Sequence, residues 1–320
     1  MSRRALLRLA QVVVAALVLW YVGRALARAW QDYQANALDL HVAWGPVLAS
    51  GLVFLGTYAV LIETWRAVVR QWGERLSFLD AARIWTVSSL TRYLPGKLWQ
   101  IPLMGRMAQQ RGVSPIAAAG AAVIGTVVNI AAGFVVALAL APSLLEAARP
   151  GAARAGLALA IVGVLGLVAL PWVLPHLLRL AARVIRRPLD VGALPMRAIV
   201  VALAGNLVAW FLYGWAFRLF ALGIVGQAPG RLVDWVAAWA ISYVIGYIVL
   251  ILPAGVGARE GALYTVLPAA GLAVPSQAIV IAVASRLWLT ILEIVPGLVF
   301  LASGALRRRE PIVGPPKHPR

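Results

Sequence analysis

Long runs of uncharged residues, separated by short charged stretches, dominate this sequence. A helix that crosses a bilayer needs about 20 apolar residues. Uncharged runs of this order occur at 42–62, 112–145, 155–178, 198–217, 235–258 and 261–285, and a shorter one lies at 9–23. The pattern predicts an all-α polytopic integral membrane protein.

The run at 9–23 has two interpretations. It follows Arg3, Arg4 and Arg8, and Ala25-Leu26-Ala27 resembles a signal-peptide cleavage site. Arg24 fits that interpretation poorly, and the internal repeat described below needs this helix, so we interpret it as a retained span.

Proline and glycine interrupt two further segments. Pro253, Gly255 and Gly257 break the run at 235–258, and a partly apolar segment at 78–94 ends at Pro95-Gly96. Irregular backbone at membrane depth is tolerated only where protein or a water-filled cavity covers it, so we expect two re-entrant helical hairpins. For 78–111, a flat amphipathic helix on the membrane surface is the alternative.

The resulting topology is a bundle of eight helical units, which are about six full spans plus two re-entrant helical hairpins. The spans are expected near 9–29, 44–65, 115–141, 154–175, 198–220 and 275–303, and the hairpins at 78–111 and 234–271.

Composition and charge support this topology and orient it. The chain is 62% hydrophobic and 12% charged, whereas soluble domains carry about 25% charged residues. Of the 29 Lys and Arg residues, sixteen fall in one set of loops and six in the other, so the positive-inside rule predicts that both termini are cytoplasmic.

The basic residues form no contiguous patch, which excludes nucleic acid as a partner. With no cysteine, the chain has no thiolate metal site, and we expect no metal or cofactor.

An internal repeat divides the chain into halves. Leu94-Pro95-Gly96-Lys97 and Leu252-Pro253-Ala254-Gly255 lie 158 residues apart, and a Gly and Pro pair that opens a long apolar helix follows each. Each half holds three crossings, so the second copy is inverted, as in many secondary transporters. We expect one transmembrane domain at 1–306, with repeats at about 1–145 and 150–306, and a basic, Pro-rich cytoplasmic tail at 307–320.

Several ionisable residues fall at membrane depth. Each costs on the order of 3 kcal/mol on insertion scales unless it pairs, reaches water or binds a ligand. Cations outnumber acids here, and the hairpin tips place helix N-termini, which bind anions, near the midplane. This predicts an anionic head group as ligand, bound by Arg92, Pro95, Gly96, Lys97, Arg106, Pro253, Gly255, Gly257, Arg259, Glu260, Arg286 and Glu293.

Less specific interpretations exist for some of these residues. Arg286 pairs with Glu293 or Glu260 if the charges only brace the bundle, and Arg106 is an interfacial anchor if it lies at the cytoplasmic mouth. The polar residues Asn129 and Asn206 either line the path or bond across helices. The aromatic residues suited to interfacial belts are Trp30, Tyr33, Trp44, Trp65, Trp72 and Trp235.

No catalytic motif is present. The chain has no Walker loop, no His-Glu-x-x-His zinc motif and no Gly-x-Ser-x-Gly elbow. We therefore predict no catalytic residue, although Glu260 or Glu293 as a general base is the alternative for an enzyme acting on a lipid-linked phosphate.

The hairpin motifs resemble a known family. Arg92-Tyr93-Leu94-Pro95-Gly96-Lys97-Leu98-Trp99-Gln100, with Arg106 behind it, is similar to the first signature of the lysylphosphatidylglycerol synthetase transmembrane family, the flippase-like domain of MprF-type proteins. The segment from Leu252 to Gly261, with Arg286-Leu287, resembles the second signature, with Pro-Ala-Gly where the family usually has Pro-Gly-Gly.

The resemblance implies a lipid flippase of the bacterial cytoplasmic membrane. Its substrate would be an anionic or aminoacylated phospholipid or a polyprenyl-phosphate-linked lipid, and its partners would be membrane lipids. The synthetase domain of MprF-type proteins has no counterpart in these 320 residues, so we expect no lysylphosphatidylglycerol synthesis. A non-transporting scaffold subunit is a third possibility, and an oligomer or a partner enzyme stays open.

Overall fold

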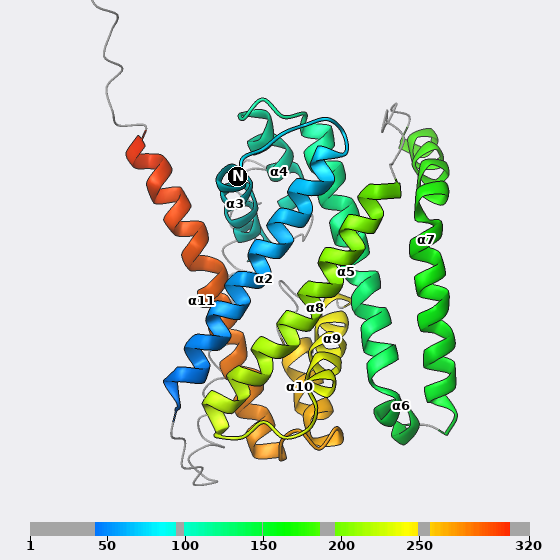
Figure 1. The fold of residues 1–320 in the computed structure, drawn as a ribbon, viewed down its shortest axis with the longest axis vertical. Helices are drawn as coiled ribbons and strands as arrows, with labels where there is room; N and C mark the ends of the chain where they lie inside the picture. The colour runs from blue at the N-terminus through cyan, green and yellow to red at the C-terminus, as the bar shows by residue number, and fades with distance from the viewer. Residues whose placement is uncertain (1–41, 94–98, 149, 186–195, 249–256, 308–320) are drawn as a thin grey trace, which may run out of the picture.

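The computed structural model describes residues 42–93, 99–148, 150–185, 196–248 and 257–307. These ranges contain helices and no strand (Figure 1). The helices are α2 (Trp44–Arg70), α3 (Phe78–Ser89), the short 3-10 helix η1 (Leu90–Tyr93), α4 (Gln100–Gln109), α5 (Pro115–Leu140), α6 (Pro142–Ala148), α7 (Ala152–Ile185), α8 (Met196–Val225), α9 (Leu232–Ile248), α10 (Ala258–Ala269) and α11 (Pro275–Arg307).

Four helices are long and apolar enough to cross a membrane: α2, α5, α8 and the Pro275–Ser303 part of α11. They confirm the long apolar helices predicted near 44–65, 115–141, 198–220 and 275–303. The helix predicted at 154–175 lies within α7, whose described apolar stretch, Ala152–Gly166, is shorter than a span. The span at 9–29 lies outside the described residues, as does the predicted tail at 307–320 apart from Arg307, which ends α11.

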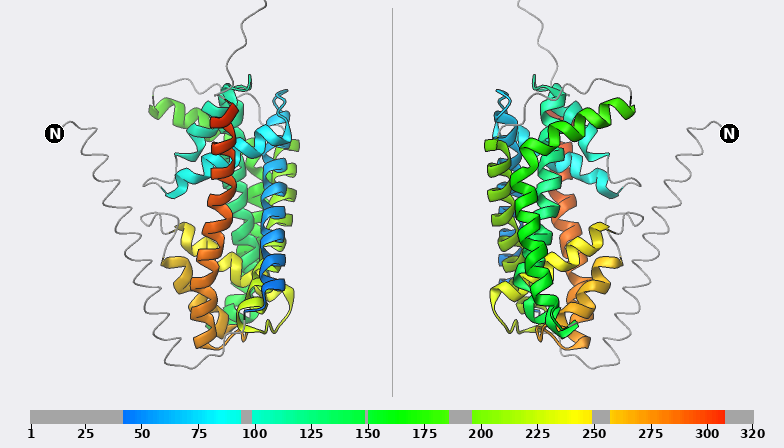
Figure 2. Two further views of the ribbon diagram at one scale, coloured as in Figure 1. Left: turned by 90° about the vertical axis from the view of Figure 1, so that its left-hand side faces the viewer. Right: turned by 90° about the vertical axis from the view of Figure 1, so that its right-hand side faces the viewer.

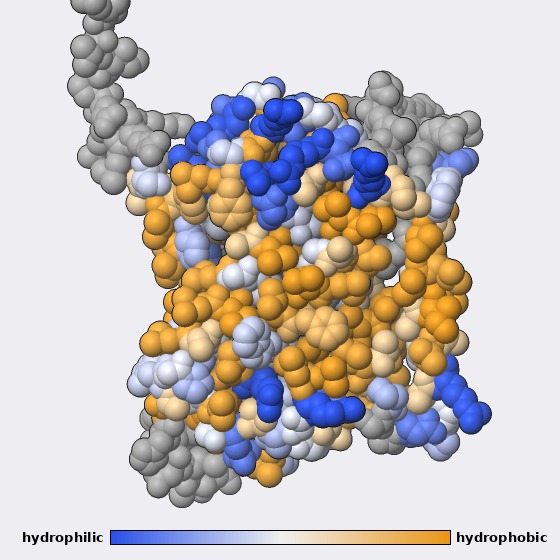
Figure 3. All heavy atoms as spheres, viewed as in Figure 1, coloured by the Kyte–Doolittle hydropathy of each residue, from blue (hydrophilic) through white to orange (hydrophobic). Residues whose placement is uncertain are grey.

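The outer surface matches a bilayer environment. Figure 3 shows a continuous apolar band around the middle of the visible face, with hydrophilic residues gathered at both ends of the long axis. Large apolar side chains such as Leu52, Ile161 and Val299 are exposed on this surface. A soluble domain seldom exposes so large an apolar area, so the chain is a helical membrane protein.

Capping residues set where the helices begin. Ser77 accepts a hydrogen bond from the Asp80 backbone N–H at the start of α3, and Ser114 accepts one from Ala117 at the start of α5. Gly257 precedes α10 with a positive φ of 87°, a conformation that glycine adopts without strain. Of the breaks noted in the sequence, Gly257 is thus a helix boundary, and Pro95, Gly96, Pro253 and Gly255 lie outside the described residues.

Short helices occupy the two segments that were predicted as hairpins. The α3–η1–α4 segment lies toward one end of the long axis, and the α9–α10 pair toward the other, on the same side of the bundle (Figure 2). Residues 94–98 and 249–256, which come between these helices in the sequence, lie outside the described residues.

Close helix packing holds the bundle together. Helices α2 and α8 pack along their length, and a Cβ added to Gly205 or Gly223 of α8 would collide with Thr64 or Val47 of α2. Small residues allow such close approach between membrane helices.

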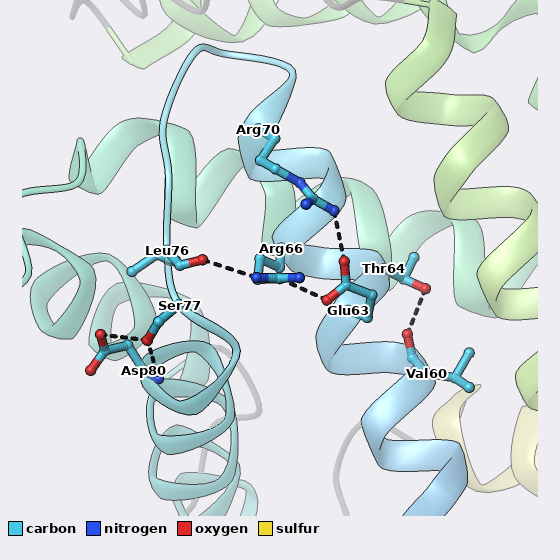
Figure 4. A network of polar contacts seen from close by, with 8 residues as sticks. All are labelled: Val60, Glu63, Thr64, Arg66, Arg70, Leu76, Ser77 and Asp80. Carbon is cyan, nitrogen blue, oxygen red and sulfur yellow. Dashed lines mark hydrogen bonds and ion pairs between the residues drawn. The ribbon is translucent and has the colours of Figure 1, made fainter.

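A polar network fixes the base of α3 to the end of α2 (Figure 4). Glu63 pairs with Arg66 and Arg70 at 2.6 Å each, and Arg66 donates to the Leu76 carbonyl at 3.2 Å. The chain therefore enters α3 from a defined position, beside the cap formed by Ser77 and Asp80.

Candidate functional site

A cavity of about 240 Å³ lies within the bundle, between the two pairs of short helices. Residues from α2, α3, η1, α4, α5, α8, α9, α10 and α11 line it, which brings together segments far apart in the sequence. The charged residues in its lining are Arg92, Arg259, Arg286 and Glu293. These four belong to the set predicted as a ligand site.

Arg259, the second residue of α10, is the most deeply buried cation of the site. It is 8% exposed, and its guanidinium carbon lies 4.0 Å from the ring centroid of Trp239 on α9. Its Nε and Nη2 atoms, and Nε1 of Trp239, have no hydrogen-bond partner among the described residues. Buried polar groups normally have partners, so this cluster of donors is suited to an acceptor-rich anion.

Arg286 lies near Glu260, with 3.8 Å between Nε and Oε1. The other carboxylate oxygen of Glu260 accepts a hydrogen bond from the Gly257 backbone N–H at 2.5 Å. Glu260 therefore caps α10 while it offsets the charge of Arg286. This is one of the two pairings considered for Arg286 from the sequence.

Arg92 pairs with Glu293 across the cavity lining. Its Nη1 lies 2.6 Å from Oε1 of Glu293, and the Tyr58 hydroxyl donates to the same oxygen at 3.3 Å. The pair joins η1 to α11 over 201 residues of sequence. The other pairing considered for Arg286, with Glu293 seven residues along α11, is thus replaced by this longer-range contact.

The charges in and beside the cavity do not balance. Arg92, Arg259 and Arg286 face Glu293 and the adjacent Glu260, which leaves one formal positive charge among the described residues. An excess positive charge in a low-dielectric site favours an anion.

Other predicted site residues lie elsewhere. Arg106 is exposed on α4 and is absent from the cavity lining, whereas Gly257 contributes the backbone N–H at the start of α10. Five further candidates lie outside the described residues: Pro95, Gly96, Lys97, Pro253 and Gly255.

Aromatic residues that the sequence did not single out form much of the wall. Trp85 and Trp239 line the cavity together with Tyr58, Tyr213 and Tyr243. Two tryptophans interpreted as interfacial anchors are buried instead, which corrects that interpretation: Trp65 donates to the Ala118 carbonyl, and Trp235 to the Pro229 carbonyl. An aromatic residue within an apolar run carries no signal for which side it faces.

Comparison with known protein families identifies the family of this chain. A family model described as the lysylphosphatidylglycerol synthase TM region matches residues 8–297. A search of curated protein sequences finds no match.

Proposed function

The chain belongs to the lysylphosphatidylglycerol synthase TM region family, and on that premise we propose that it is a flippase that moves a phosphate-bearing lipid between membrane leaflets. Membership makes it a lipid-related membrane protein, and the proposal adds the activity. It requires no catalytic residue, cofactor or metal, because a change of leaflet breaks no covalent bond.

The burial of the Arg259 side chain is the observation on which the proposal depends. A cation that is 8% exposed in a membrane protein, with two nitrogens that have no hydrogen-bond partner among the described residues, is costly unless an anion binds there. The N-terminus of α10, one residue before Arg259, adds the positive end of a helix dipole. A lipid phosphate matches both features, and its acyl chains would stay in the bilayer.

Helix packing supports the inverted repeat. Helix α3 packs against α11, and α9 packs against α5, as expected if 44–140 and 196–307 are equivalent halves. Two aromatic pairs repeat in the same way: Trp65–Trp85 at 6.4 Å between ring centroids and Phe217–Trp239 at 4.9 Å. We infer six spans and two re-entrant hairpins that enter from opposite sides.

The repeat also suggests how the site is exposed. Rocking of one repeat against the other would open the cavity alternately to the two leaflets. The Arg92–Glu293 pair joins η1 of the first repeat to α11 of the second, so this pair would break in one of the two states. We place the protein in the bacterial cytoplasmic membrane, with both termini on the cytoplasmic side.

Reconstitution tests the proposal. Purified protein in liposomes that contain a fluorescent phosphatidylglycerol is mixed with a membrane-impermeant quencher, and the fraction of lipid that reaches the outer leaflet is followed. Wild-type protein should accelerate the exchange, and Arg259→Gln should slow it at least about tenfold, since one lost charge-assisted contact is worth about 1.5–3 kcal/mol.

Arg154→Gln is the matched control, because Arg154 is exposed on α7 and away from the cavity. Its exchange rate should equal that of the wild type. Unchanged exchange in a well-folded Arg259→Gln protein would overturn the site assignment. Conversion of the lipid into a new chemical species would favour the enzyme alternative, and the absence of exchange and conversion would favour the scaffold.

A further inference from the structure

Glu293 is an acid inside a cavity that otherwise suits an anion. It lies in α11, its side chain is 18% exposed, and it is the acid in the described part of the cavity lining. Arg92 lies 2.6 Å from its Oε1 atom, and the Tyr58 hydroxyl donates to the same oxygen at 3.3 Å. Acids at membrane depth are costly and often form part of a path for ions or protons. A site for an anion gains nothing from a fixed negative charge, so this acid needs an explanation.

Among the described lining residues, Glu293 is the one whose charge a proton changes most easily. The cations that share the cavity with it are Arg92 of η1, Arg259 of α10 and Arg286 of α11. The phenols are Tyr58 of α2, Tyr213 of α8, and Tyr243 and Tyr247 of α9. Arginine and tyrosine side chains ordinarily keep their protons up to about pH 10, whereas carboxylic acids titrate several pH units lower. The described parts of α3, α4 and α5 add no titratable group to the lining.

Glu260, the acid beside the cavity, has a different environment. Its Oε2 atom accepts a hydrogen bond of 2.5 Å from the Gly257 backbone N–H at the start of α10, a position that favours a charged carboxylate. Its Oε1 atom lies 3.8 Å from Nε of Arg286 and has no hydrogen-bond partner among the described residues. Glu260 is thus the second place for a proton, but it caps a helix and is absent from the cavity lining.

A bound phosphate and an ionised Glu293 compete for the same positive charges. Glu293 interacts electrostatically with Arg259 as well as with Arg92, and both arginines line the cavity. Like charges in a low-dielectric site repel each other strongly. A bound phosphate therefore favours the neutral form of Glu293. By linkage, a protonated Glu293 strengthens phosphate binding by the same factor.

Two states of the cavity are well compensated, and a third is not. Without lipid, the ionised Glu293 pairs with Arg92. With lipid and a proton, the phosphate replaces the carboxylate as the anion near the arginines. With lipid but no proton, two anions share one small cavity of about 240 Å³. The lipid and the proton are therefore expected to bind together.

We propose that Glu293 is a proton-binding site coupled to the lipid phosphate, so that one proton crosses the membrane with each anionic head group. The proton comes from water on the side where the lipid enters and forms the O–H bond of the neutral carboxyl group. It returns to water on the other side when the Arg92–Glu293 pair forms again. No covalent bond of the lipid changes. This inference rests on the proposed function and adds a proton gradient as the energy source.

Co-transport also removes an electrical cost. An anionic head group that crosses alone moves its charge through the membrane potential. A head group with one negative charge and one proton together form a neutral load. The membrane potential then neither drives nor opposes the movement, and the pH gradient alone sets its direction.

A pH gradient across liposomes tests the coupling. Protein is reconstituted with a trace of fluorescent phosphatidylglycerol, the membrane potential is held at zero with potassium and valinomycin, and an impermeant quencher reports the final distribution between leaflets. One proton per lipid predicts about a tenfold enrichment in the leaflet that faces the alkaline side for each pH unit. The ratio is the same for both orientations of the protein. An equal distribution, or enrichment on the acidic side, would overturn the inference.

Acid-to-amide variants identify the proton site. Glu293→Gln cannot take up a proton, so its leaflet distribution should stay near equal under the gradient. Glu146→Gln is the matched control, because Glu146 is exposed on α6, and it should retain the tenfold enrichment. Enrichment that persists in Glu293→Gln would refute the assignment. Loss of enrichment in Glu260→Gln with retention in Glu293→Gln would place the proton on Glu260 instead.

Proton uptake by the wild type tests the coupling without transport and without a variant that has to fold. Calorimetry measures phosphatidylglycerol binding to the full-length protein in detergent, in buffers with different enthalpies of ionisation, which gives the number of protons bound per lipid. Up to about one proton per lipid should be taken up between about pH 5 and pH 8. No uptake across this range would overturn the inference.

The two measurements also separate this inference from the proposed function. Proton uptake on binding, but no lipid exchange in liposomes, would refute the flippase and keep the proton site. Exchange that ignores the pH gradient, with no proton uptake on binding, would support the flippase and refute the coupling.

Discussion

Replacement of Arg259 by methionine should stabilise the lipid-free protein while it abolishes lipid binding. Two guanidinium nitrogens are buried with no hydrogen-bond partner in the part of the chain that the structure describes, and each such group costs about 1–3 kcal/mol. The cation–π contact with Trp239, 4.0 Å from the ring centroid, contributes about 0.5–2 kcal/mol in the opposite direction. Methionine keeps most of the apolar packing of the arginine stem, so the middle of these two ranges gives a net gain of about 2–3 kcal/mol.

Thermal unfolding in detergent measures this gain. A difference of about 1 kcal/mol corresponds to a rise in Tm of roughly 2 °C for a chain of this size. Added phosphatidylglycerol should raise the Tm of the wild type and leave that of Arg259→Met unchanged, because a ligand stabilises only the protein that binds it. Arg154→Met, at an exposed position, should behave like the wild type in both conditions.

The opposite pattern would refute this reasoning. If Arg259→Met lowers the Tm by several degrees with or without lipid, the arginine stabilises the fold through its contacts with Trp239 and neighbouring acids. The site would then be structural, and the excess positive charge would need another explanation.

Three further predictions concern the bundle around the site. Glu293→Gln should destabilise the protein by about 1–3 kcal/mol in denaturant unfolding, because the Arg92–Glu293 pair at 2.6 Å is mostly buried. The double variant Arg92→Glu with Glu293→Arg, which exchanges the two charges, should recover part of the lost stability. No recovery would contradict a direct interaction between the two side chains. Gly205→Ala should destabilise by about 1–3 kcal/mol, since its Cβ would collide with α2, and a neutral effect would contradict the close packing of α2 and α8. In this cysteine-free chain, Leu79→Cys should react with an impermeant maleimide only from the cytoplasmic side and Val274→Cys only from the opposite side, whereas labelling of both from one side would contradict the inverted repeat.

The sequence predicted the long helices and the charged members of the site for simple physical reasons. Apolar runs of about 20 residues have few folding options other than spanning helices. Charges inside such runs are too costly to be incidental, and this argument identified Arg259, Arg286 and Glu293. Gly257 was predicted to break a helical run, and the structure places it directly before α10, because turn chemistry is local.

The partner of each charge was not predictable, because it depends on tertiary packing. The spacing along α11 suggested that Glu293 lies on the face of Arg286, yet its partner is Arg92, 201 residues earlier in the sequence. The aromatic lining of the cavity was equally unpredictable, whereas Asn129 and Asn206 were expected either to line the path or to bond across helices, and they do both. Trp85 and Trp239 lie in apolar segments where any face is plausible, and the bond between Asn129 and Asn206 requires α5 and α8 to be adjacent.

Direct detection of a phosphate at Arg259 tests the central claim most directly. Protein labelled with ¹⁵N arginine and bound to phosphatidylglycerol is studied by solid-state NMR, and ³¹P–¹⁵N dipolar recoupling reports guanidinium nitrogens in contact with the lipid phosphorus. The account predicts dephasing from a charge-assisted hydrogen bond, with about 2.7–2.9 Å between nitrogen and oxygen, and its loss in Arg259→Met. Dephasing that persists unchanged in Arg259→Met, or no dephasing in the lipid-bound wild type, would contradict the account.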